Sequence, residues 1–296
     1  MKYLVNIIIA ALLGGDFCFC QAVRSDSAGA VVSFANATAF TVDPRGNRYV
    51  LDAIQNVVVK INSSGAPVRS VGGYGWSDLS FDQPRDINAP NGLDVYIADY
   101  GNHRIVRYDH NLNFVSTIPP GSAPEGKDPP FRYPRSVAVS RLGALYIIDG
   151  DNGRIVKYSN ENAIDQSFGN TGTGDARLRA PVRVRVTADD RLYVQDGTVL
   201  KVFDAFGSFV VALGEGLFRP PVTFTIDQSS VYIADSSRIY VMDGMRHIDT
   251  LMNFGQSLYT GKRDSLIDIA VFRDTLYALT QKRITPLAPL KRSGSR

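Results

Sequence analysis

The chain has 296 residues, of which 44% are hydrophobic, and this is enough apolar material for a large buried core. Its 32 Lys and Arg residues exceed its 29 Asp and Glu residues by only three. Such a small excess gives no reason to expect a nucleic-acid partner.

The N-terminus has the pattern of a secretory signal peptide. Lys2 precedes a short apolar run that could not span a bilayer as a helix, and Ala22 is a small residue suited to cleavage. Cleavage there would remove Cys18 and Cys20, and lipidation is disfavoured because Phe precedes each of them. No later stretch is long and apolar enough for a transmembrane helix. We expect residues 1–22 to be removed and the chain to be exported to a periplasm or outside the cell; an uncleaved anchor or a buried helix is the alternative.

A short motif, a Tyr followed three residues later by an Asp, recurs along the rest of the chain. Five copies place the acid at Asp52, Asp99, Asp149, Asp196 and Asp235, and a sixth copy at Tyr277 has lost it. Successive copies are 39 to 50 residues apart. Alternating, β-branched runs precede and follow each copy, so each unit predicts about four antiparallel strands. This period and strand content indicate the blades of a β-propeller.

Six copies predict six blades. The sixth unit reaches the end of the chain after its third strand, near residues 286–289, while a spare apolar run at 30–34 precedes the first unit. We predict that this N-terminal strand completes the sixth blade and closes the ring, which removes the open sheet edge. The expected architecture is one monomeric domain over residues 23–290, with a disordered polar tail at 291–296.

The second and third units resemble the NHL repeat. Residues 96–108 read Tyr-Ile-Ala-Asp-x-x-Asn-x-Arg-Ile-Val-x-Tyr, and residues 146–158 repeat this with Ile in place of Ala. The first unit departs from the signature at Gln55 and Val57, and the hairpins of units four to six are shorter. The resemblance covers about residues 38–287 and implies an all-β fold, a six-bladed propeller of four-stranded antiparallel blades.

The five turn acids could suggest a metal or acid–base site, but a structural role is the better interpretation. An Asp at the end of a strand accepts hydrogen bonds from turn N–H groups. Because the Asp recurs in five units, we expect it to have the same structural role in each. The segment 149–153 has carboxylates but neither the spacing nor the distal Glu of a calcium loop.

The three histidines are His103, His110 and His247. Resemblance to the NHL family also implies a possible metal-dependent lyase, since some of its propellers carry several His around the central channel. Here no two His fall on predicted inner strands, so no metal or other cofactor is expected.

The predicted inner strands carry charges in alternate units, at Asp86, Arg183, Arg185 and Asp268. These four side chains are expected to line the mouth of the central channel. Two interpretations stay open: they bind a polar ligand, or they pair with one another, as buried charges must.

The long loops are rich in aromatic and Arg residues, the usual anchors of a binding surface. The candidate partner-binding residues are Tyr74, Trp76, Phe81, Tyr100, His103, Phe131, Arg132, Tyr133, Phe218 and Arg219. The alternative is that these rings pack into the grooves between blades.

The sequence supports three hypotheses about function. The first is an exported, non-catalytic module that binds a protein, peptide or envelope glycan through its loops. The second, which the resemblance allows, is a metal-dependent lyase or a lactonase-like hydrolase with its site in the channel. The third is RNA binding, which some NHL propellers perform on a basic face; the predicted export and small net charge disfavour it.

Overall fold

The computed structural model describes residues 32–119, 130–160, 163–170, 174–220, 222–227, 230–243, 247–253 and 265–289. The predicted signal peptide, the predicted tail and the strand-boundary residue Pro221 lie outside these ranges. No helix in the described ranges combines the length and the apolar character needed to cross a membrane.

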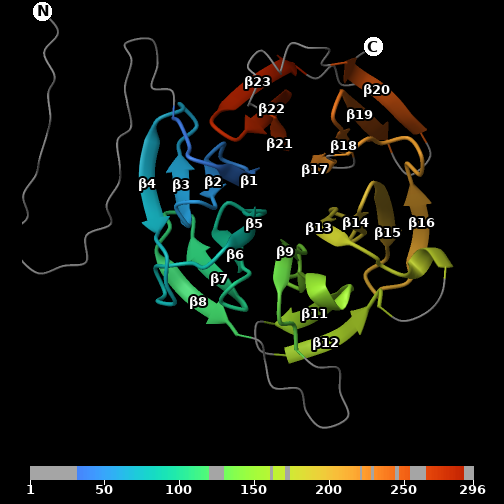
Figure 1. Cartoon of the computed structure of the whole chain (residues 1–296), viewed down its shortest axis with the longest axis horizontal. Helices are drawn as coiled ribbons and strands as arrows, with labels where there is room; N and C mark the ends of the chain where they lie inside the picture. The colour runs from blue at the N-terminus through green and yellow to red at the C-terminus, as the bar shows by residue number, and fades with distance from the viewer. Residues whose placement is uncertain are drawn as a thin grey trace, which may run out of the picture.

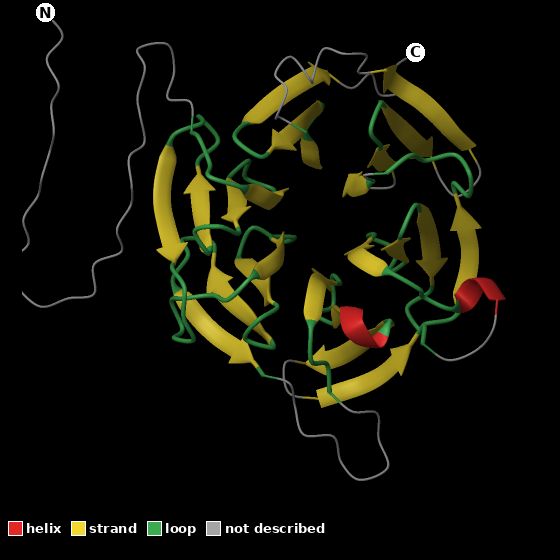
Figure 2. Cartoon of the chain, viewed as in Figure 1, coloured by secondary structure: helices red, strands yellow, loops and turns green. Residues whose placement is uncertain are grey.

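Six antiparallel sheets stand radially around a central channel, as predicted from the repeat (Figure 1). In the first three blades the strands are β1 Ala37–Val42, β2 Arg48–Asp52, β3 Val57–Ile61 and β4 Pro67–Gly72; β5 Pro84–Asn88, β6 Asp94–Asp99, β7 Arg104–Asp109 and β8 Phe114–Ile118; β9 Pro134–Val139, β10 Leu145–Asp149, β11 Arg154–Asn160 and β12 Ala163–Phe168. In the last three they are β13 Pro181–Val186, β14 Leu192–Asp196, β15 Val199–Phe203 and β16 Phe209–Leu213; β17 Thr223–Asp227, β18 Ser230–Ala234, β19 Arg238–Asp243 and β20 His247–Asn253; β21 Leu266–Phe272, β22 Thr275–Thr280 and β23 Ile284–Pro289. Two short 3-10 helices, Gly150–Asn152 and Gly174–Ala176, lie in loops (Figure 2).

Each blade is a meander that starts at the channel and proceeds outward, so its turns alternate between the two ends of the ring. We call one end the loop face; it carries the turns between second and third strands and the segments between blades, such as 73–83. We call the other end the turn face; it carries the turns between first and second strands, such as 43–47, and between third and fourth strands, such as 62–66.

The core consists of six apolar clusters, each between two neighbouring blades. The cluster between the first two blades contains Tyr49, Leu51 and Ile97. The last cluster joins Phe40 of β1 to Leu279 of β22, so apolar packing also closes the ring between the sixth blade and the first. Burial of both faces of each blade explains why the second strands are almost continuously apolar.

The repeated Asp at the end of the second strand ties each of the first five blades to the loop that leads into it. Its carboxylate accepts hydrogen bonds from backbone N–H groups 16 or 17 residues earlier, for example from Ala35 and Asn36 to Asp52 at 2.7 and 3.1 Å. Asp99 also accepts from Arg104 Nε at 2.8 Å, and so fixes its own hairpin. This geometry matches the structural role expected for the turn acids.

The structure differs from the predicted ring closure. Residues 32–34 lie outside any strand, Ala30 and Val31 fall outside the described residues, and the sixth blade has three strands among the described residues. The physical reason is the Asp52 carboxylate, which holds residues 35–36 as the loop leading into the first blade. This loop meets the sixth blade through Phe34 N, which donates to Lys282 O at 3.0 Å.

Replacement of one repeated acid tests this role. Asp149 is fully buried and accepts from Arg154 Nε at 3.1 Å and from two backbone N–H groups. We expect Asp149→Ala to lower the free energy of unfolding in denaturant by about 3–5 kcal/mol, because Arg154 is left buried without its carboxylate. Asp151→Ala, on the same loop but exposed, should cost about 1 kcal/mol or less. Equal losses in the two variants would contradict the role assigned to the repeated Asp.

Candidate functional site

In five of the six blades, as far as the structure describes them, the innermost strand begins with a β-bulge. Strand pairing skips a residue between Pro84 and Asp86, and the same shift recurs in four other blades. A bulge bends a strand and re-aims the side chain that comes after it. The residues at this level, one from each blade, are Ala39, Asp86, Ser136, Arg183, Thr223 and Asp268.

The four charged channel residues predicted from the sequence meet as two bidentate ion pairs. Arg183 donates to both carboxylate oxygens of Asp268, with the Nη2–Oδ2 bond at 2.8 Å. Arg185 donates to both oxygens of Asp86 at 2.8 and 2.9 Å. Arg183 also lies 3.9 Å from Asp86, which joins the two pairs. Of the two interpretations left open by the sequence, the geometry therefore matches the one in which these residues pair with one another. The charges of the two Arg and two Asp side chains sum to zero.

Two hydroxyl groups and one backbone amide extend these pairs to every blade. Ser136 donates to Asp86, and Thr223 donates to Asp268 at 2.9 Å. From the first blade, Phe40 N donates to Asp268 Oδ2 at 3.1 Å. We call the set Asp86, Ser136, Arg183, Arg185, Thr223 and Asp268 the charge network; with Phe40 N it connects all six blades.

The charge network keeps Asp86 and Arg183 ionised. Burial alone would raise the pKa of Asp86, but the positive charge and hydrogen bonds of Arg185, with Arg183 and Ser136, outweigh it and hold that pKa below its usual value. Burial would lower the pKa of Arg183, yet Asp268 and Asp86 raise it above its usual value. Both groups are therefore charged over the whole physiological range.

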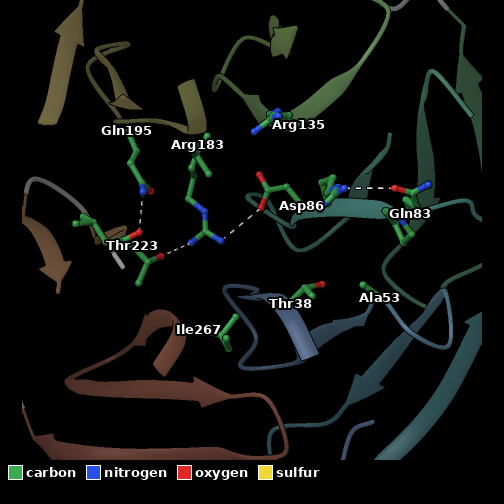
Figure 3. A pocket seen from close by; sticks show the side chains of 13 residues that line it. Thr38, Ala53, Gln83, Asp86, Arg135, Arg183, Gln195, Thr223 and Ile267 are labelled. Atoms are coloured by element: carbon green, nitrogen blue, oxygen red, sulfur yellow. Dashed lines mark hydrogen bonds and ion pairs between the residues drawn. The ribbon is translucent and has the colours of Figure 1, made fainter. Parts of the chain in front are cut away.

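The charge network separates two cavities that share no lining residue. The loop-face cavity has a volume of about 450 Å³ and is lined by Asp86, Arg183 and Thr223 together with the exposed Arg85 and Arg135 (Figure 3). The turn-face cavity has a volume of about 970 Å³ and is lined by the next level of inner-strand residues: Thr41, Asn88, Ala138, Arg185, Thr225 and Ala270. Both volumes fall within the range of about 300–1,000 Å³ that is usual for small-molecule sites.

Three of the predicted loop aromatics are core residues. Phe81, Phe131 and Phe218 are buried, and each packs edge-on against a Tyr of its blade's third strand, as Phe81 does against Tyr108 at 6.1 Å between ring centroids. For these three residues the structure therefore supports the alternative interpretation, in which the rings pack between blades. Their shared position, three residues before the strand-boundary Pro, is a repeat signal of the same kind as the turn Asp.

Two other aromatics project into solvent from a loop that is tightly held. Tyr74 is 73% exposed and Trp76 is 76% exposed. Arg104 donates to the backbone carbonyl of Trp76 at 3.1 Å and to those of Ser77 and Ser80 at 2.8 Å, and Asn102 Nδ2 donates to Gly75 O at 2.8 Å. The second blade's hairpin thus fixes the loop's backbone while its two largest side chains stay available.

A second aromatic group bridges the second and third blades. The Tyr133 ring lies 5.4 Å from the Tyr100 ring and 4.7 Å from the His103 ring. His103 Nδ1 lies 2.6 Å from the carbonyl oxygen of Arg132, and the Tyr100 hydroxyl lies 3.2 Å from both carboxylate oxygens of Asp151. Burial and the Asp151 carboxylate raise the pKa of Tyr100.

The side chains of Arg132 and Arg219, the last two predicted loop residues, are exposed on the same face. Their backbone N–H groups donate to Asp149 and Asp235. The structure therefore brings Tyr100, His103 and Tyr133 together, with Arg132 beside them, and leaves Arg219 on a separate loop.

The histidines lie away from the charge network. His103 is on the loop face, and His110 is on the turn face, where its carbonyl accepts a hydrogen bond from the Tyr49 hydroxyl. His247 begins β20, on the outer side of the fifth blade. Within the described ranges, no three His, Cys, Asp or Glu side chains gather in a way that could hold a metal ion.

Two curated relatives support the interpretation of the repeat. The chain is 34% identical over 138 residues to the mouse NHL repeat-containing protein 3 and 31% identical over 141 residues to the human one. The chain is a six-bladed β-propeller whose repeats are similar to those of NHL-repeat proteins. It spans about two fifths of the length of these relatives, at 40% and 41%, and the matches cover 40% and 43% of the chain itself. No protein-family model matches the sequence.

Solved structures share the propeller fold of this chain. A catalytically inactive virginiamycin B lyase from Staphylococcus aureus with quinupristin has a TM-score of 0.54 at 14% identity, over 84% of this chain and 80% of that one. A streptogramin B lyase has a TM-score of 0.56 at 10% identity, over 88% and 85%. At this identity the likeness concerns the fold alone.

The direction of the Asp86 pKa shift predicts how the propeller responds to acid. An Asp in an unfolded chain has a pKa of about 3.9. Because the folded pKa is lower, Asp86 contributes stability above about pH 4 that is lost as the pH falls through the folded pKa. We expect Asp86→Asn to cost about 3–5 kcal/mol of unfolding free energy at neutral pH, and the difference from wild type to narrow as the pH falls below 4.

Denaturant unfolding from pH 7 to pH 3 measures this difference. Asp165→Asn is a suitable control, because Asp165 is an exposed partner of Lys157 and should cost about 1 kcal/mol or less. A cost for Asp86→Asn that stayed constant down to the lowest pH would show that its ionisation is not linked to folding.

Proposed function

We propose that this chain is an exported, non-catalytic binding module whose loop face engages a protein, peptide or envelope glycan. The observation that carries the proposal is the held loop at 73–83, which presents Tyr74 and Trp76 to solvent. Large exposed aromatics on a fixed backbone lose little conformational entropy on binding, and such residues dominate the energetics of interfaces.

The neighbouring loops extend this surface. Beside it the Tyr133 ring contacts the Tyr100 ring and, edge-on, the His103 ring. The Arg85 guanidinium lies 5.0 Å from the Tyr100 ring centre. Exposed Arg132 and Arg135 add positive charge, which favours a partner with acidic groups. Export rests on the N-terminal pattern alone, and we propose a monomer because the propeller closes on itself.

Two variants test the proposed binding face. We expect Trp76→Ala to reduce capture of envelope partners at least tenfold while it changes the melting temperature little, because the ring is exposed and contributes no core packing. Tyr100→Ala should weaken capture more than it lowers the melting temperature. The measurement is affinity capture on immobilised wild-type and variant protein with quantitative mass spectrometry of the bound fraction.

The matched control is Phe206→Ala. Phe206 is 79% exposed in the turn between β15 and β16 on the turn face, so it offers a comparable ring at the opposite end. Equal partner loss in Trp76→Ala and Phe206→Ala, or a lower melting temperature with unchanged capture, would contradict the proposal.

The alternative is a metal-dependent lyase or a lactonase-like hydrolase with its site in the channel, which the fold shared with the streptogramin B lyases favours. Asp86 and Asp268 in the channel already accept two Arg hydrogen bonds each, which opposes their use as bases. Incubation of the protein with quinupristin and Mg²⁺, followed by mass spectrometry, distinguishes the two functions. We expect the intact quinupristin mass; conversion by the wild-type protein that stops when the metal is chelated would establish the enzyme instead.

A further inference from the structure

The mouth of the loop-face cavity is a ring of side chains with a polar half and an apolar half. Each blade contributes one residue, the one directly before its residue at the level of the charge network. In blade order these residues are Thr38, Arg85, Arg135, Val182, Val222 and Ile267. The first three blades therefore present a hydroxyl and two guanidinium groups, and the last three present aliphatic side chains. Figure 3 shows Arg135 and Ile267 on opposite sides of the cavity.

The side chains of this mouth ring are open to solvent. Each of the six is exposed or half-buried, and Val182 is 42% exposed. Asp86 and Arg183, which also line the cavity, are only 2% and 8% exposed and are already paired within the charge network. A ligand in the mouth can therefore contact the ring without displacing any buried pair.

The two arginines of the mouth carry positive charge that is compensated only in part. Among the described residues the Arg85 guanidinium has one hydrogen-bond acceptor, Gln83 Oε1 at 3.4 Å, and it lies over the Tyr100 ring. Arg135 has no acceptor at hydrogen-bond distance in the described ranges; Asp151 Oδ1 lies 3.7 Å from its Nη2. Because the charge network is neutral, these two cations and one carboxylate leave a surplus of one positive charge at the mouth.

This arrangement suits a small anion with an apolar body. A guanidinium binds a carboxylate through two parallel hydrogen bonds, and a carboxylate has the single negative charge that matches the surplus. Covering the three aliphatic side chains removes apolar surface from water, which favours binding. The volume of about 450 Å³ suits a small molecule. We propose that the loop-face cavity binds an organic acid with one carboxylate and an apolar body, the carboxylate held by Arg85 and Arg135 and the body by the aliphatic half of the mouth.

This inference rests on the proposed function only in assigning binding to the loop face. Tyr74 and Trp76, which carry that proposal, do not line the cavity. Trp76→Ala should therefore leave the affinity for the acid unchanged, whether or not it reduces the capture of envelope partners. Failure of one proposal can thus be told apart from failure of the other.

A saturation-transfer NMR titration of the intact protein tests the class of ligand. The probes are 3-phenylpropanoate and 4-methylpentanoate, with 3-phenylpropan-1-ol as the uncharged control and acetate as the control without an apolar body. We expect at least one of the two apolar acids to bind about tenfold or more tightly than either control, and its Kd to rise when the salt concentration is raised, because salt screens the arginines. Absence of binding by both apolar acids, or equal affinity for an apolar acid and either control, would overturn the proposal.

Three variants locate the site. Arg85→Gln and Arg135→Gln should each weaken binding of the acid about fivefold or more, because each removes a charge-assisted hydrogen bond. Val182→Thr, which keeps the shape but adds a hydroxyl, should weaken binding by a smaller factor. Arg132→Gln is the matched control, since Arg132 is an exposed arginine of the same face that does not line the cavity. Wild-type affinity in both Arg85→Gln and Arg135→Gln, or an equal loss in Arg132→Gln, would overturn the assignment.

Discussion

The ion pair between Arg183 and Asp268 is the constraint on which the channel depends. It joins residues 85 positions apart, across the ring from the fourth blade to the sixth, and the Asp86–Arg185 pair joins residues 99 positions apart. Buried charges are tolerated only when their partners are placed well. Because the partners stand on different blades, that placement requires a ring of this diameter, and the network therefore favours six blades over an open or larger arrangement.

At the perimeter of the ring, apolar packing and backbone hydrogen bonds hold the blades together instead of ion pairs. Apolar clusters between neighbouring blades supply most of the burial, including the cluster that joins the sixth blade to the first. The repeated Asp residues attach each inter-blade loop to its hairpin, so the loop face is formed by backbone that the repeat itself fixes. Only side chains that point away from these attachments, such as Trp76, are left free to differ in function.

Much of the fold could be predicted from the sequence, because the repeat encodes the same local structure several times. The Tyr and Asp of each motif predict a strand pair, and the spacing between successive motifs predicts the ring of blades. The closure could not be predicted, because the apolar run at 30–34 fits a strand as well as it fits a loop. The deciding features are the Asp52 carboxylate, which holds residues 35–36 as a loop, and Phe34, which like Phe81 lies three residues before its inner strand in an apolar cluster between two blades.

The candidate site could be predicted in part. Period-two counting along the inner strands identified Asp86, Arg183, Arg185 and Asp268, but it could not tell which blades face one another or that Ser136 and Thr223 complete the network. The aromatics were separable in principle: a ring that recurs at one repeat position packs, and a ring that does not, such as Trp76, is exposed. The turn-face cavity has no local sequence signal, because it forms only where six strands converge.

A double-mutant cycle on Arg183 and Asp268 tests the central claim most directly. The free energy of unfolding in denaturant is measured for wild type, Arg183→Met, Asp268→Leu and the double variant. If the pair holds the ring across its channel, each single change is costly and the double variant is about as stable as either single one, which gives a coupling of about 2–3 kcal/mol. Costs that simply add would show that the two side chains act independently and that the ring is held by its apolar perimeter alone.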